Sequence, residues 1–76
     1  MTKIAVKVEL SDDGLPISFT LVGRKFSVTE LMDSWYGADH AYFKVVADDG
    51  NLYVIRHDLE ENDWEMVLME SRNGKV

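Results

Sequence analysis

Polar and apolar residues alternate along most of this chain, as expected of strands with one buried and one solvent-exposed face. The first alternating run ends at Leu10, and the second follows the turn sequence SDDG and Pro16. The positions predicted to face inward in these runs are Ile4, Val6, Val8, Leu10, Ile17, Phe19 and Leu21. A third strand is expected from Lys25, because Gly23 and Arg24 suit a two-residue hairpin turn of type II′.

The stretch from Ser27 to Tyr36 fits two periods. Phe26 and Val28 continue the alternation of a strand. The apolar residues at helical spacing are Val28, Leu31, Met32 and Trp35. We expect a strand with a bend or bulge near Glu30, since β-branched and aromatic residues surround it and the preceding hairpin ties it to the second strand. A short helical turn over residues 29–35 is the alternative.

The clearest hairpin pattern is YFKVVADDGNLYVIRHD, residues 42–58. A three-residue loop of Asp48, Asp49 and a left-handed Gly50 sets the register that we favour. This register places on the buried face Phe43, Val45, Tyr53 and Ile55. It places on the outer face Tyr42, Lys44, Val46, Leu52, Val54 and Arg56. A two-residue loop would redistribute these sets.

An acidic loop over residues 58–63 leads to a last strand with three inward positions. These positions are Trp64, Met66 and Leu68. About five to six short strands with turns between them predict an all-β antiparallel meander that curls into an SH3-like or similar small barrel. We expect one domain over residues 1–70 and a frayed polar tail over residues 71–76.

Composition narrows the possible functions. A chain of 76 residues supports one core, and the absence of cysteine excludes disulfides, thiolate metal sites and cysteine nucleophiles. The formal net charge of −6 disfavours a nucleic-acid partner. The alternating N-terminus and the lack of a long apolar run predict a cytoplasmic protein without a membrane partner.

Two adjacent aromatic residues in the sequence DSWYG, residues 33–37, are the first candidates for a binding site. Neighbours on a strand point to opposite faces, so we expect Trp35 to pack in the core with Trp64 and Phe43. Tyr36 would then cap a barrel end with its hydroxyl in water. The alternative is a partner-binding surface that includes Tyr36, His40 and Tyr42.

Each histidine has an acidic neighbour. In the favoured register His40 and Asp58 face each other across the open end of the hairpin, next to His57 and Asp39. Imidazoles and carboxylates can bind metal, but no ligand-spacing motif is present, and we expect surface ion pairing instead. The chain also lacks nucleophile, phosphate-loop and metalloprotease motifs, so we expect neither a cofactor nor enzymatic activity.

A nucleic-acid surface is the alternative function. Tyr42, Lys44 and Arg56 share the outer face of the predicted hairpin, and Arg24 and Lys25 at the other turn could extend it. An aromatic side chain between cations on a curled sheet is typical of proteins that stack single-stranded bases. Solvation of ordinary surface cations explains the same pattern.

Three segments together, GRKFSVTELMDSWYG, YFKVVADDGNLYVIRHD and WEMV, resemble a group of short uncharacterised bacterial and archaeal all-β proteins. The resemblance covers roughly residues 22–68 and involves mostly turn and core residues, so it implies a fold rather than a site. Some members accompany lesion-bypass DNA polymerases, which implies an accessory role in DNA processing. The acidic stretch over residues 58–65 departs from the basic residues expected there.

These patterns predict a cytoplasmic protein-interaction or accessory module without catalytic activity, which binds an unidentified protein. The alternative is an accessory domain that binds single-stranded nucleic acid. The surface residues proposed for contact are Tyr36, His40, Tyr42, Lys44, Arg56 and His57.

Overall fold

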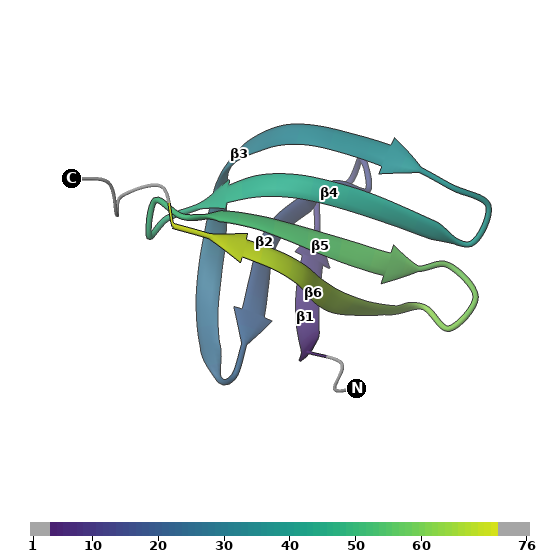
Figure 1. Ribbon diagram of the computed structural model, residues 1–76, viewed down its shortest axis with the longest axis horizontal. Coiled ribbons are helices and arrows are strands. Elements are labelled where there is room, and N and C mark those ends of the chain that lie inside the picture. Colours follow the sequence, from purple (N-terminus) through teal and green to yellow (C-terminus); the bar gives the residue numbers. More distant parts are fainter. Residues whose placement is uncertain (1–3, 72–76) are drawn as a thin grey trace.

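Antiparallel strands, joined in sequence order by turns, are the only regular secondary structure in the described part of the chain. The computed structural model describes residues 4–71, and most of the predicted tail therefore lies outside the described residues. The strands are β1 (Ile4–Leu10), β2 (Pro16–Leu21), β3 (Arg24–Tyr36), β4 (His40–Ala47), β5 (Leu52–Asp58) and β6 (Asp63–Glu70) (Figure 1). β1 pairs with β6, which closes the sheet into a small barrel and confirms the predicted all-β class. Within residues 4–71 no helix is long and apolar enough to span a membrane.

The core is centred on three aromatic rings. The Phe19 and Phe26 rings stack with centroids 5.2 Å apart, and Tyr53 meets Phe19 edge-on at 5.1 Å. Around them lie the buried residues Val6, Ala41, Phe43, Val45, Ala47, Ile55, Trp64 and Met66. The inward positions predicted for the β4–β5 hairpin are all confirmed.

The β4–β5 hairpin has the three-residue loop that we favoured. Ala41 pairs with His57, and Val46 pairs with Leu52. Gly50 has a φ of 83° and donates its N–H to the carbonyl of Ala47 at 2.9 Å. A left-handed residue at this position suits glycine, which has no Cβ to clash.

β3 is one bent strand, and the helical alternative for residues 29–35 was wrong. The strand carries bulges between Val28 and Glu30 and between Leu31 and Asp33. It pairs with β2 from Arg24 to Ser27 and with β4 from Val28 to Tyr36. Bulges bend a strand and increase its twist, so β3 turns from one half of the barrel into the other.

The turn between β2 and β3 differs from our prediction. Leu21 pairs with Arg24, so the central residues are Val22 and Gly23 rather than Gly23 and Arg24. Their φ values are 49° and 79°. Positive φ at both central residues defines a type I′ turn, whose twist matches the flanking strands.

Three predicted inward positions in β1 and β2 are exposed, and irregular pairing between the two strands explains two of them. Leu10 pairs with Pro16, and the register shift leaves Ile17 without a cross-strand partner in β1. Ile17 is therefore 49% exposed and Leu10 44% exposed. Ile4, at the rim of the barrel, is 48% exposed.

A second irregularity moves Leu68 outward. Val54 pairs with Leu68 whereas Ile55 pairs with Met66, so Val67 is an extra residue in β6. An extra residue reverses the alternation beyond it. Leu68 shares the outer side of Val54 and is 46% exposed, contrary to our prediction.

The far ends of β3, β4, β5 and β6 extend beyond the rest of the barrel (Figure 1). We call this extension the tongue and define it as residues 35–42 and 56–63. Its two turns are joined because Leu59 donates its N–H to the carbonyl of Asp39 at 2.9 Å. The candidate surface lies on the tongue.

Candidate binding surface

One row of side chains crosses the outer face of β3, β4, β5 and β6 where the tongue joins the barrel. Trp35 pairs with Tyr42, Tyr42 with Arg56, and Arg56 with Glu65. Directly opposed residues on antiparallel strands bring their side chains into contact on the same face. We call these four residues the outer row.

The exposed end of the outer row is an aromatic stack. The Trp35 and Tyr42 rings lie 5.5 Å apart with an angle of 8° between their planes. Trp35 nevertheless stays 45% exposed. Tyr42 therefore fixes the orientation of the Trp35 indole while leaving much of it in contact with solvent.

The other end of the outer row is polar. The Tyr42 hydroxyl raises the pKa of Arg56 above its usual value, and the Glu65 carboxylate adds to the effect. Arg56 also donates to Glu65 in an ion pair. The guanidinium is thus held between a hydroxyl and a carboxylate of the same protein.

Our prediction that Trp35 packs in the core with Trp64 and Phe43 was wrong. A single bulge near Glu30 would have turned Trp35 inward. The second bulge, between Leu31 and Asp33, reverses the alternation again and returns Trp35 to the outer face. Trp64 does pack against Phe43, with centroids 5.7 Å apart.

The surface residues proposed from the sequence are divided between the outer and inner faces of β3, β4 and β5. The register places on the outer face His40, Tyr42, Lys44 and Arg56. Tyr36 and His57 lie on the inner face, in the row of Ala41. Tyr36 meets Phe43 edge-on at 5.9 Å and is 65% exposed, as expected of a residue at a barrel end. These six residues therefore form two surfaces rather than one.

The two histidines also lie apart. Nε2 of His40 is 3.7 Å from Oδ2 of Asp58, which is the ion-pair geometry expected for this side of the hairpin. The His57 ring instead stacks on Trp64 at 4.1 Å, and its Nε2 is 2.9 Å from Oδ1 of Asn62. Within residues 4–71 no group of three or more potential ligand side chains is placed to hold a metal ion.

Sequence reasoning missed Trp35 and Glu65 as parts of the candidate surface. The turn after β3 contained the signal for Trp35, because Tyr36 pairs with Ala41 across it. Phe43 is buried, so Ala41, two residues before it, faces inward as well. Its partner Tyr36 therefore faces inward, and the neighbouring Trp35 faces outward. Glu65 depends on the register between β5 and β6, which no turn signal fixed.

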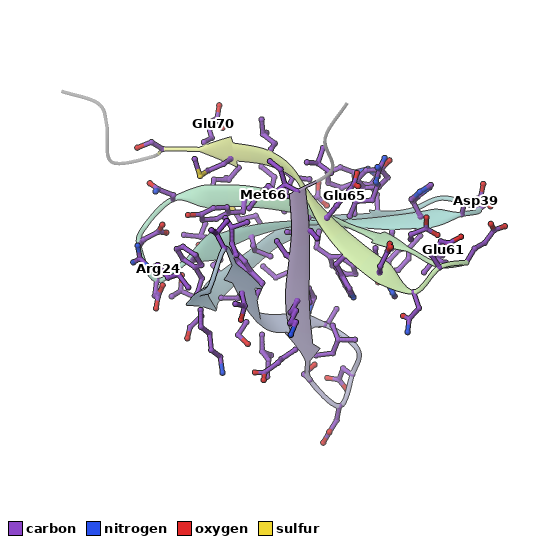
Figure 2. All side chains as sticks on the ribbon, turned by 90° about the horizontal axis from the view of Figure 1, so that it is seen from below. Arg24, Asp39, Glu61, Glu65, Met66 and Glu70 are labelled. Carbon is purple, nitrogen blue, oxygen red and sulfur yellow. The ribbon has the colours of Figure 1, made fainter. Side chains whose placement is uncertain are left out.

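The tongue is strongly acidic. Figure 2 shows Asp39 and Glu61 together at its end. The acidic residues of its two turns and adjoining strand ends are Asp39, Asp58, Glu60, Glu61 and Asp63. The exposed aromatic stack therefore lies beside a region of negative charge, and Lys44 pairs with Asp33 across the strands.

Comparison with known proteins adds no relative. No protein-family model, no curated protein and no solved structure matches the chain.

Proposed function

We propose that this chain is a cytoplasmic protein-interaction module without catalytic activity, and that it binds its partner through the outer row. The main observation behind this proposal is that the Trp35 side chain is exposed and stacks on the Tyr42 ring. A large, ordered aromatic side chain in solvent is typical of a contact surface.

The chemistry of the outer row supports a protein partner. Tryptophan, tyrosine and arginine are the residue types most enriched among those that dominate the energy of protein interfaces. Trp35 and Arg56 are already held by neighbouring side chains, so binding would cost little side-chain entropy.

The negative charge of the tongue indicates the charge of the partner surface. The acidic turns beside the outer row would repel an acidic surface and attract a basic one. We therefore expect an apolar pocket for Trp35 on the partner, bordered by lysine or arginine. Electrostatic attraction of this kind mainly raises the association rate and weakens with added salt.

The proposal can be tested with a matched pair of variants. Trp35→Ser removes the exposed indole, and Ile17→Ser removes an apolar side chain of similar exposure, 49%, on β2. Immobilised wild type and variants are used to capture proteins from the source cells, and each captured protein is then purified for direct titration. We expect a partner whose affinity falls at least about tenfold with Trp35→Ser and stays nearly unchanged with Ile17→Ser.

A capture pattern that is the same for all three proteins would contradict this proposal. Equal losses with both substitutions would also contradict it, because the outer row would then have no special role. Circular dichroism of both variants establishes that the fold is retained before binding is compared.

Single-stranded nucleic acid is the second candidate ligand. The observation in its favour is the stacked pair of Trp35 and Tyr42 near Lys44, since bases stack on exposed aromatic rings. The pairing of Arg56 with Glu65 and the acidic turns favour a protein partner instead.

A further inference from the structure

The strand β1 has a backbone edge that the barrel does not use. β1 pairs with β6 only from Ile4 to Val6. From Lys7 to Leu10 it pairs with β2 on one side, and among residues 4–71 no strand pairs with its other side. An unpaired strand edge presents backbone N–H and C=O groups that can bind another extended chain.

A groove lies beside this edge. Figure 2 shows β1 running away from β6 and the tongue beyond the place where Glu65 and Met66 meet it. The groove has a volume of about 440 Å³. Its lining residues are Val6, Lys7, Val8, Leu10, Asn62, Asp63 and Trp64.

The walls of the groove differ in chemistry. Val8 packs against the core, Trp64 is buried and Leu10 is 44% exposed, so the floor and one wall are apolar. The far wall, from Asn62 to Asp63, is polar. Alternate side chains of an added strand could therefore contact apolar and polar surfaces in turn.

An acidic turn continues each wall of the groove. Directly beyond Leu10 the β1–β2 turn carries Asp12 and Asp13, and directly before Asn62 the tongue carries Glu60 and Glu61. Among the described residues that line the groove, Lys7 is the single basic one. The surrounding charge therefore favours a positively charged occupant.

We propose that the edge of β1 and this groove bind an extended, basic peptide segment of another protein, which adds to the sheet as a strand. Backbone hydrogen bonds to β1 supply affinity, apolar side chains contact Val8 and Trp64, and basic side chains face the acidic turns. This site is distinct from the outer row and does not depend on Trp35.

The experiment uses a labelled peptide of alternating lysine and valine. Two control peptides accompany it: one with glutamate in place of lysine, and one with the same charge but N-methylated backbone amides, which cannot complete a strand ladder. Each is titrated into isotope-labelled protein at low salt, and backbone amide shifts are followed by NMR. We expect binding of the first peptide alone, with the largest shifts from Lys7 to Leu10.

Two variants with the same charge change locate the site. Leu10→Lys puts a positive charge in the groove, whereas Ile17→Lys puts one at a similarly exposed position on β2. We expect Leu10→Lys to weaken peptide binding by roughly tenfold or more and Ile17→Lys by less than about threefold. Trp35→Ser should leave peptide binding unchanged, so failure of the outer-row proposal would not be confused with failure of this one.

Three outcomes would overturn the proposal. The first is the absence of binding at millimolar peptide. The second is equal binding of the N-methylated peptide, which would mean charge attraction without strand addition. The third is a binding site elsewhere on the protein, shown by equal weakening in the two lysine variants or by shifts centred on the outer row.

Discussion

Aromatic residues serve opposite purposes in the body of the barrel and in the tongue. In the body, Phe19, Phe26 and Tyr53 interlock and are 1%, 5% and 2% exposed. In the tongue, Trp35 and Tyr36 are 45% and 65% exposed. Residue type alone therefore does not separate core from contact surface in this chain, and the position along each bent strand decides.

This difference has an energetic consequence. A body ring loses its whole surface to the core, where packing is close to that of a crystal. Trp35 stacks on one ring, that of Tyr42, and is still 45% exposed. We therefore expect substitutions in the body to change the free energy of unfolding, and those on the outer face of the tongue to change binding instead.

The two tryptophans give the largest expected contrast. Trp64 is 9% exposed and packs on both Phe43 and His57. Trp64→Ala should lower the free energy of unfolding by about 3–5 kcal/mol, because it leaves a cavity at the base of the tongue. Urea denaturation followed by far-UV circular dichroism measures this change.

Trp35→Ala is the matched control. We expect it to cost below about 1 kcal/mol, as is usual for exposed positions. Similar losses for the two substitutions would break the distinction between body and tongue, and would mean that Trp35 supports the fold.

The fold was largely readable from the sequence because alternation and turn chemistry are local signals. Asp-Asp-Gly at residues 48–50 fixed both the β4–β5 loop and the inward set around Phe43 and Tyr53. The exposed Ile17 and Leu68 could not be predicted in the same way. Each follows an irregularity in pairing, whose position depends on how the barrel closes rather than on the residues nearby.

The β2–β3 turn in the body gives a second test, in which we expect a substitution to raise the free energy of unfolding rather than lower it. Val22 has a φ of 49° and is 92% exposed. A β-branched residue is strained at positive φ, and asparagine before glycine is the preferred type I′ sequence. Val22→Asn should therefore raise the free energy of unfolding by about 1 kcal/mol.

Val67→Asn is the control for Val22→Asn. Val67 is 48% exposed, and its φ is not positive. Its replacement should be neutral or slightly destabilising, since asparagine is disfavoured in strands. Stabilisation by both substitutions to a similar degree would exclude relief of turn strain as the cause.

The β4–β5 loop is linked by hydrogen bonds to Tyr53 in the body of the barrel. Tyr53 donates its hydroxyl to Oδ2 of Asp49 at 2.6 Å, and Asn51 donates to the same side chain. Burial opposes ionisation of Asp49, but these hydrogen bonds outweigh it and lower the pKa of the carboxyl group. Asp49→Asn should cost about 1 kcal/mol near neutral pH.

The pH dependence follows from the lowered pKa. The folded protein holds the ionised Asp49 more favourably than the unfolded chain does, so its contribution is complete above the unfolded pKa of about 3.9 and is lost as the pH falls through the folded value. The difference between wild type and Asp49→Asn should therefore shrink in acid. A difference that stays constant from neutral to acidic pH would contradict the assigned role of the carboxylate.

The candidate surface was less readable than the fold. Tyr42, Lys44 and Arg56 were placed together correctly because the β4–β5 register fixes them. Trp35 was misplaced because we predicted one bulge in β3, near Glu30, whereas the strand carries two. Arg56 looked available for phosphate, but its partner Glu65 comes from a strand whose register the sequence did not define.

The smallest expected effect concerns nucleic acid, because we expect no binding of single-stranded oligonucleotides. The tongue offers an aromatic stack, but Arg56 is paired with Glu65 and Lys44 faces Asp33. A base that stacks on Trp35 brings its phosphate toward acidic turns in a protein of formal charge −6. A labelled single-stranded oligonucleotide should therefore show no anisotropy change at low salt.

Two results together would reverse this conclusion. The first is binding that weakens with salt by a slope of about −0.7 per phosphate contact. The second is loss of that binding in Lys44→Glu and Arg56→Glu but not in Lys7→Glu. The Lys7 variant carries the same charge change on β1, so only a site on the outer face of the tongue would separate the three variants.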